Sequence, residues 1–176
     1  MKEYFICFFV ILMLTSCTIN PDSQSDIGPE LQNRMGVMYA KGLGVKQDYH
    51  KAFGFYMKAA NQNYAQAQNN VAFCYVSGRG VKKDYSKAME WYLKAAQQNH
   101  AEAQNNIGVM YEKAEGVPQD YKKAMEWYLK AANNGNANAR KNIGNLFYYG
   151  RGVPQNYANA MKWYQSINKS DIYLAE

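Results

Sequence analysis

The sequence is poor in the residues that form metal sites and disulfide frameworks. Of its 176 residues, 2 are His and 3 are Cys. A zinc site takes about three or four His, Cys or carboxylate ligands, and small disulfide-stapled proteins are much richer in Cys. We therefore expect no metal, no cofactor and no disulfide-stapled fold. Charged residues at 19% and hydrophobic residues at 48% also argue against a disordered tail or a membrane bundle.

Long apolar runs are also missing, with one exception near the N-terminus. Tyr4 to Leu14 is an unbroken apolar stretch of eleven residues, which has the length of a signal-peptide core and is shorter than the ~20 residues of a bilayer span. It is followed by Thr-Ser-Cys, and the resulting Leu-Thr-Ser-Cys ending at Cys17 resembles the bacterial lipoprotein signal. The resemblance implies a signal peptide over residues 1–16, a lipid on Cys17 and a flexible tether completing residues 17–28. An ordinary cleaved leader and an uncleaved anchor are the alternatives.

The residue after the lipidated Cys bears on location. In the lipoproteins that this signal resembles, Asp at that position holds the product in the inner membrane, whereas this chain has Thr18. The resemblance therefore implies a lipid anchor in the outer membrane of an organism with two membranes. The expected location is the bacterial cell envelope, facing either the periplasm or the cell surface. Loss of the leader would leave Cys74 as the one unmodified thiol, which we expect to be a small core residue.

The rest of the chain is dominated by an internal repeat of about 36 residues. The segments 65–100 and 101–136 match at most positions, and the pattern continues over residues 29–64 and over residues 137–176, which include a C-terminal cap. Because the repeat contains several Tyr positions, it accounts for the unusual total of 16 Tyr. The pairs in register are Gly44-Val45, Gly80-Val81, Gly116-Val117 and Gly152-Val153, with Phe55-Tyr56, Trp91-Tyr92, Trp127-Tyr128 and Trp163-Tyr164.

Each unit is predicted to form two helices joined by a short turn. In the third unit, apolar residues such as Ile107 and Met110 recur at helical spacing, and Gly108 beside them permits a close approach of the second helix. The Gly-x-Gly-Val segment ends the first helix because glycine adopts the left-handed conformation readily. Ala114 replaces the first of these glycines, so we expect the third turn to differ slightly. Asp120 and its equivalents are placed to cap the second helix.

The repeated pattern closely resembles the Sel-1-like repeat family, a relative of the tetratricopeptide repeats. Its elements are Ala-x-Ala-Gln, Ile-Gly-x-x-Tyr, Gly-x-Gly-Val, Asp-x-x-Lys-Ala and Trp-Tyr-Leu-Lys-Ala-Ala, and the resemblance covers about residues 30–168. It implies an all-α fold, a right-handed α/α superhelical solenoid of about four helix-turn-helix repeats with a concave side. Members of this family are scaffolds and adaptors. The resemblance therefore implies a non-enzymatic interaction scaffold of the envelope, which we expect to be monomeric and to bind a protein or peptide in its concave groove.

The first helix of each unit is expected to line the concave side, and its variable face is the candidate partner-binding surface. Phe73 and Tyr148 are the best anchors because aromatic residues dominate interface hot spots. Asn69 and Asn105 are expected to hydrogen-bond to a peptide main chain. The alternative is that Phe73 and Val109 only pack against the next layer. The candidate partner-binding residues are Asn33, Val37, Asn69, Phe73, Val76, Asn105, Val109, Glu112, Lys141, Asn145 and Tyr148.

An envelope enzyme or cell-wall-binding protein, β-lactamase-like or peptidoglycan-binding, is the alternative function. Ser166 to Lys169 spells the Ser-x-x-Lys of serine β-lactamases, but the Ser-Asp-Asn and Lys-Thr-Gly elements do not occur. We therefore interpret the match as chance and assign no catalytic residue. His50 and His100 occupy different places in their repeats, and we expect both on the surface.

The net charge is +6, which raises the question of a nucleic-acid partner. Many of the lysines recur along the second helices, and Glu90–Lys94 and Glu126–Lys130 have the spacing of helical ion pairs. We expect these lysines to form a solvated outer face. Nucleic acid is therefore not an expected partner, and an envelope location would also remove access to it.

Overall fold

The computed structural model describes residues 27–168. The predicted signal peptide, Cys17, most of the tether and Lys169 lie outside this range. Among the described residues every regular element is helical, and none of these helices is both long and apolar enough to cross a membrane. The elements are α2 (Pro29–Lys41), α3 (Tyr49–Asn61), α4 (Ala65–Ser77), α5 (Tyr85–Ala96), α6 (Ala101–Lys113), α7 (Tyr121–Asn133), α8 (Ala137–Tyr149), α9 (Tyr157–Gln165) and the short 3-10 helix η2 (Ser166–Asn168).

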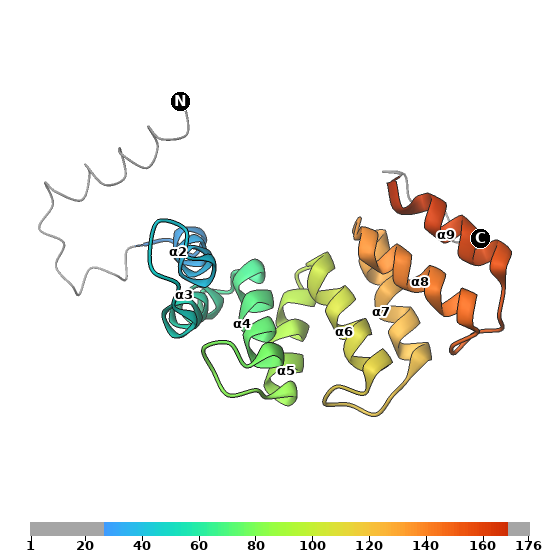
Figure 1. Cartoon of the computed structure of the whole chain (residues 1–176), viewed down its shortest axis with the longest axis horizontal. Coiled ribbons are helices and arrows are strands. Elements are labelled where there is room, and N and C mark those ends of the chain that lie inside the picture. The colour runs from blue at the N-terminus through green and yellow to red at the C-terminus, as the bar shows by residue number, and fades with distance from the viewer. Residues whose placement is uncertain (1–26, 169–176) are drawn as a thin grey trace, which may run out of the picture.

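The helices pair into four hairpins that follow one another in chain order along the molecule (Figure 1). The pairs α2–α3, α4–α5, α6–α7 and α8–α9 correspond to the four repeats seen in the sequence, and helices of successive hairpins pack against each other. One hairpin cannot bury its apolar side alone, whereas stacked hairpins share a continuous core. The predicted all-α solenoid is confirmed.

The second helix of every repeat begins at a capping side chain, as the sequence predicts. Asp120 accepts a hydrogen bond from the backbone N–H of Lys123 at 2.9 Å, and such a cap contributes about 1 kcal/mol. The equivalent caps are Asp48 to Lys51, Asp84 to Lys87 and Asn156 to Asn159.

The first helix of every repeat ends in the left-handed conformation. Gly78 has φ 71° and ψ 20°, and Ala114 at the equivalent place has φ 58° and ψ 36°. The prediction that the third turn differs is therefore wrong. The Ala114 N–H still donates to the carbonyl of Met110, so the hydrogen bond that closes the helix outweighs the cost of a left-handed residue with a side chain.

The first three hairpins are each closed by packing and by one hydrogen bond between side-chain amides, and in the fourth Arg140 donates to the carbonyl of Ser166. Ile107 on α6 and Tyr128 on α7 are both 0% exposed, and the two helices pack against each other. Gln68 on α4 is also buried, and its Oε1 accepts a hydrogen bond from Nε2 of Gln98 at the end of the same repeat at 2.8 Å. The equivalent bonds join Gln62 to Gln32 and Asn134 to Gln104.

The lysines of the second helices lie on the exposed side, but the predicted pairing with Glu does not form within the described residues. Nζ of Lys94 lies 4.1 Å from the ring centroid of Trp91, and Nζ of Lys130 lies 4.3 Å from that of Trp127. A cation over an indole face is favourable. Each of these two lysines therefore contacts the Trp three residues earlier on its helix instead of the Glu four residues earlier.

Candidate partner-binding groove

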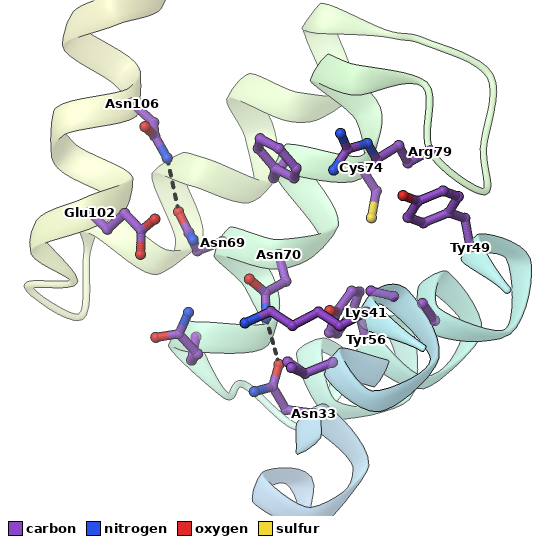
Figure 2. Close-up of a pocket in the computed structure, with 15 residues that line it drawn as sticks. Asn33, Lys41, Tyr49, Tyr56, Asn69, Asn70, Cys74, Arg79, Glu102 and Asn106 are labelled. Atoms are coloured by element: carbon purple, nitrogen blue, oxygen red, sulfur yellow. Dashed lines mark hydrogen bonds between the residues drawn. The ribbon is translucent and has the colours of Figure 1, made fainter. Parts of the chain in front are cut away.

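A cavity of about 470 Å³ lies across the first three hairpins (Figure 2). Residues of the first helices α2, α4 and α6 line it, together with residues of α3 and the turn after α4. Four residues of the predicted partner-binding set meet here, namely Asn33, Val37, Asn69 and Phe73. The first helices therefore do line a groove, and the repeats that contribute most of it are the first and second.

Phe73 is the main apolar group offered by this groove. Its side chain is 47% exposed, which is more than packing against a neighbouring layer requires. The guanidinium of Arg79 lies 5.6 Å from the ring centroid of Phe73 and 5.4 Å from that of Tyr49 in the first repeat. Arg79 thus contacts aromatic rings of two repeats, and Phe73 stays half-exposed beside it.

The predicted amides form hydrogen bonds between successive repeats. Nδ2 of Asn70 donates to Oδ1 of Asn33 at 2.8 Å, and Nδ2 of Asn106 donates to Oδ1 of Asn69 at 3.2 Å. Asn105 accepts from Asn142 in the same way at 3.0 Å. Asn33, Asn69 and Asn105 are buried. We refer to these three inter-repeat bonds as the asparagine ladder, because they couple repeat to repeat through the oxygen atoms of Asn33, Asn69 and Asn105.

In the first two pairs of the ladder, part of each amide has no protein partner. Within the described part of the chain, no protein group hydrogen-bonds to Nδ2 of Asn33 or Asn69, or to Oδ1 of Asn70 or Asn106. Each of these four atoms keeps some solvent exposure, because no described side-chain N or O atom without a partner is fully buried. All four residues line the cavity, with Asn33 6% and Asn69 3% exposed. Each of these two Asn–Asn pairs therefore keeps one donor and one acceptor that no protein group uses.

The charged residues of the groove lie on two opposite edges. Lys41 ends α2 and Arg79 follows α4, so both lie at the C-terminal ends of first helices, whereas Glu102 lies in the first turn of α6. Figure 2 shows Glu102 beside Asn69 and Asn106 on one side, with Arg79 near Tyr49 on the other. No salt bridge engages these three charges among the residues from 27 to 168.

Two predicted residues in the second half of the chain are used internally. The hydroxyl of Tyr128 donates to Oε2 of Glu112 at 2.6 Å, and burial together with this carboxylate raises the pKa of Tyr128 far above its usual value. The hydroxyl of Tyr164 donates to Oδ1 of Asn145 at 2.8 Å. Glu112 and Asn145 therefore stabilise their own hairpins.

The remaining predicted residues do not join the cavity. Val76 and Val109 are partly buried and pack against the apolar core. Lys141 is exposed on α8, and Tyr148 is 43% exposed with its ring against Tyr149 and Tyr157. Of the candidate residues, Asn33, Val37, Asn69 and Phe73 therefore line the cavity over the first three hairpins, and partner binding by the others stays a prediction.

Sequence reasoning missed Lys41, Arg79 and Glu102, and it missed the second Asn of each ladder pair. The sequence did contain a signal for the ladder. Asn-Asn recurs at residues 69–70 and 105–106, whereas the first repeat has Arg34 in place of the second Asn, and no earlier repeat of the described chain is there for it to bond to. Arg79 occupies the variable place of Gly-x-Gly-Val, where a residue can vary because it is exposed.

His100 is not the simple surface residue that the sequence suggested. Its Nδ1 accepts a hydrogen bond from the backbone N–H of Ala103 at 3.2 Å, so it caps α6, and its Nε2 lies 3.1 Å from Oε1 of Gln66. Burial lowers the pKa of His100 below its ordinary value of 6.5, and nearby Glu102 opposes this shift. His50 is exposed, as predicted.

Neither Ser166 nor Cys74 is arranged as a nucleophile. Ser166 is 5% exposed, its Oγ donates to the carbonyl of Trp163 at 2.6 Å, and its own carbonyl accepts from Arg140 at 2.7 Å. Cys74 is buried, and burial raises the pKa of its thiol to about 11, so it stays protonated near neutral pH. No group of three or more metal-binding side chains occurs among the described residues.

Comparison with known proteins identifies the repeat. The Sel1 repeat family matches residues 29–64, 65–100, 101–136 and 137–167. No protein of curated function matches the chain. The fold is similar to the crystal structure of a Sel1 repeat protein from Oxalobacter formigenes, with 37% identity and a TM-score of 0.78 over 87% of this chain and 62% of that one.

Two other solved structures are similar. The c5321 protein, described as a protective antigen of uropathogenic Escherichia coli with an SLR fold, is 37% identical with a TM-score of 0.74 over 81% of this chain and 30% of that one. Cysteine rich protein B of Helicobacter pylori is 28% identical with a TM-score of 0.53 over 70% of this chain and 88% of that one. The chain thus spans 62% and 30% of the first two structures. Four matched repeats and these neighbours place the chain in the Sel1 repeat family.

Proposed function

We propose that this chain is a lipid-anchored scaffold of the bacterial cell envelope that binds a protein or peptide in the groove lined by α2, α4 and α6. Sel1 repeat proteins are in general interaction scaffolds without enzymatic activity, and this chain has four such repeats. The observation that carries the proposal is Phe73, which is 47% exposed beside a cavity of about 470 Å³. Aromatic residues in such concave sites dominate the energetics of protein interfaces.

The envelope part of the proposal depends on the N-terminal sequence. The eleven-residue apolar stretch followed by Leu-Thr-Ser-Cys supports lipidation of Cys17. A single acyl chain binds a membrane only weakly, so the two chains of a diacylglycerol are needed for a stable anchor. Thr18 supports the outer membrane as the destination.

The enzymatic alternative receives no support from the arrangement of Ser166. A serine nucleophile needs a base within hydrogen-bond reach of its hydroxyl, whereas the hydroxyl of Ser166 donates to the carbonyl of Trp163 and the residue is buried. The repeats around it serve packing. We therefore retain the scaffold as the function.

Site-specific photo-crosslinking in the producing cell tests the proposal. A photoreactive residue replaces Phe73 in one strain and Leu93 in a control strain, since Leu93 is 36% exposed on α5, away from the groove. We expect a protein adduct that forms from position 73 and is absent from position 93. Glycan adducts, crosslinks within the chain alone, or identical adducts from both positions would refute binding in the groove.

A further inference from the structure

The contacts between successive repeats show what each hairpin presents to the hairpin that follows it. The Gly-x-Gly turn of one repeat lies on the Tyr that begins the second helix of the preceding repeat, and a Cβ atom on Gly152 would lie 2.5 Å from Cβ of Tyr121. One residue further along the same face, the ring of Phe53 packs edge-on against that of Tyr75 in the next repeat, with centroids 5.5 Å apart. We call this side of a hairpin, which receives the first helix and turn of the following repeat, its stacking face.

The stacking face of the fourth repeat is uncovered within residues 27–168. Tyr157 and Met161 on α9 occupy the places of Tyr121 and Met125 on α7. They are 57% and 55% exposed, whereas Tyr121 and Met125 are partly buried and pack against the apolar core. The hairpin of α8 and α9 is the last of the row (Figure 1), so this face presents to solvent the side chains that the other repeats use for stacking.

Lys141 gives the same face a different polar chemistry from the other repeats. It occupies the place on α8 at which the ladder has Asn33, Asn69 and Asn105, whose oxygen atoms accept hydrogen bonds from the following repeat. A lysine ammonium donates only. Lys141 is exposed, and no salt bridge of the described residues engages it. The group that meets Lys141 therefore has to be an acceptor, and a carboxylate is the strongest one.

The surroundings of Lys141 are basic. Residues 137–168 include Arg140, Lys141, Arg151 and Lys162 but no Asp or Glu. Arg151 pairs with Glu112 of the third repeat, which leaves the exposed Lys141 and Lys162 without an acidic residue in their own hairpin. A negatively charged surface is attracted to such a face, and a basic one is repelled.

A second copy of this chain matches the face in shape but not in charge. Gly44 of the first repeat is the equivalent of Gly152, and no atom lies within 4 Å of a Cβ placed on it, so its turn is open to stack on Tyr157 of another copy. The first repeat, however, has exposed Arg34 at the place of the second ladder Asn. Head-to-tail stacking would put Arg34 opposite Lys141, and juxtaposed like charges disfavour it.

We infer that Lys141, Tyr157 and Met161 form a second interaction surface, which binds an acidic α-helix of another protein. A helix is the element that this face receives at every joint of the described chain, where α3 packs against α4, α5 against α6 and α7 against α8. The bound helix presents an apolar side chain to Met161 and a carboxylate to Lys141. This surface lies on the end of the stack rather than in the groove, so the inference goes beyond the proposed function and gives the scaffold two docking places.

Site-specific photo-crosslinking from the stacking face is the test. A photoreactive residue replaces Met161 in the producing cell, and mass spectrometry identifies the crosslinked peptide. The yield is compared among the otherwise unchanged chain, Lys141→Glu and the control Lys82→Glu. Lys82 is exposed in the turn after α4, so its reversal makes the same change in net charge away from the face. Circular dichroism and thermal melting of each variant establish that it is folded.

We expect an adduct with another protein, at a segment that is helical and rich in Asp and Glu. Lys141→Glu should lower its yield about tenfold or more, and Lys82→Glu should leave it unchanged. An adduct with residues 169–176 of the same chain, an adduct with a second copy, a yield that does not depend on Lys141, or the absence of any adduct would overturn the inference. Each of these results leaves the proposed function standing, because that function is tested separately by crosslinking from position 73.

A charge swap tests the direct contact with Lys141. The captured segment is synthesised as a fluorescent peptide, and its affinity for the full chain purified in detergent is measured by fluorescence anisotropy. Changing the acidic residue nearest the crosslink to Lys should weaken binding to the wild type about tenfold and restore binding to Lys141→Glu. Weaker binding to the wild type without recovery on Lys141→Glu would refute the pairing of this carboxylate with Lys141.

Discussion

Gly108 on α6 lies directly against the ring of Tyr128 on α7, and a Cβ atom on Gly108 would lie 2.5 Å from Cε1 of that ring. Tyr128 is 0% exposed, so the ring has little room to move. We predict that Gly108→Ala destabilises the protein, because overpacking costs about 1–3 kcal/mol and the gain in helix propensity returns at most about 1 kcal/mol. Urea unfolding measures the change in the free energy of unfolding.

The second repeat provides the matched control for this prediction. It has Ala72 where the other repeats have Gly, and Ala72 and Tyr92 are buried in the same apolar cluster. Ala72→Gly should also destabilise, by about 1 kcal/mol, because it adds backbone freedom and leaves a small void. If Gly108→Ala proved as stable as the wild type, the close contact between α6 and α7 would not be under steric constraint.

The asparagine ladder should show energetic coupling between repeats. Replacing Asn69 by Ala leaves Nδ2 of Asn106 without its acceptor, so each single substitution is expected to cost about 1–3 kcal/mol. A double-mutant cycle of Asn69→Ala and Asn106→Ala, measured by urea unfolding, should give an interaction energy of about 1 kcal/mol. Asn61→Ala, at an exposed position on α3, is the control and should change stability by less than about 0.5 kcal/mol. Additive single effects would contradict the ladder.

Much of the fold could be predicted from the sequence because its determinants are local and repeated. Asp120 as a cap and Gly108 as a close-packing residue follow from helix rules that involve neighbours in the same hairpin. The ladder could not be predicted in the same way. Its bonds join residues 37 positions apart, such as Asn33 and Asn70, and the sequence pattern alone does not distinguish an amide that bonds to the next repeat from one that faces a partner.

The candidate site was predicted only in part for a related reason. Phe73 was singled out because aromatic residues dominate interface hot spots, whereas Arg79 lies in a turn whose direction depends on how two repeats stack. The contact of Arg79 with Tyr49 of the preceding repeat exists only in the stacked solenoid. Charges at the edges of a groove therefore required the three-dimensional arrangement.

His100 should make stability depend on pH. Nδ1 of His100 accepts from the N–H of Ala103 only when it is unprotonated, and burial lowers the pKa of this residue below 6.5. The folded state therefore binds the proton less readily than the unfolded state. Its contribution is fully present above about pH 6.5 and is lost as the pH falls through the lowered folded pKa. Urea unfolding at pH 7.5 and at successively lower pH values measures this loss.

The fourth repeat suggests the control for the effect of pH. Asn136 occupies the equivalent place and caps α8 through Oδ1 to the N–H of Ala139 at 2.8 Å. His100→Asn should keep the cap and flatten the part of the pH dependence that His100 causes, while exposed His50 is unchanged. A pH profile of the variant identical to that of the wild type would show that His100 does not contribute.

Lipidation of Cys17 is testable independently of the groove. In the producing bacterium, the wild-type chain should incorporate radiolabelled palmitate and sediment with the membrane fraction, because a diacylated N-terminus holds it there. Cys17→Ser removes the acceptor thiol and should abolish both. Cys74→Ser is the matched control, since Cys74 is buried in α4, and it should remain labelled. Membrane attachment of Cys17→Ser without label would favour an uncleaved anchor instead.

The stability of Phe73→Ala decides whether Phe73 belongs to a binding surface or to the core. A half-exposed ring contributes little buried area, so its removal should cost only about 1 kcal/mol, including the contact with Arg79. Leu146→Ala is the comparison, because Leu146 is 0% exposed and such a truncation costs about 2–5 kcal/mol. Both are measured by urea unfolding under identical conditions. A loss at Phe73 as large as that at Leu146 would mean that Phe73 supports the packing of successive repeats, and the groove would then lose the residue on which the proposed function depends.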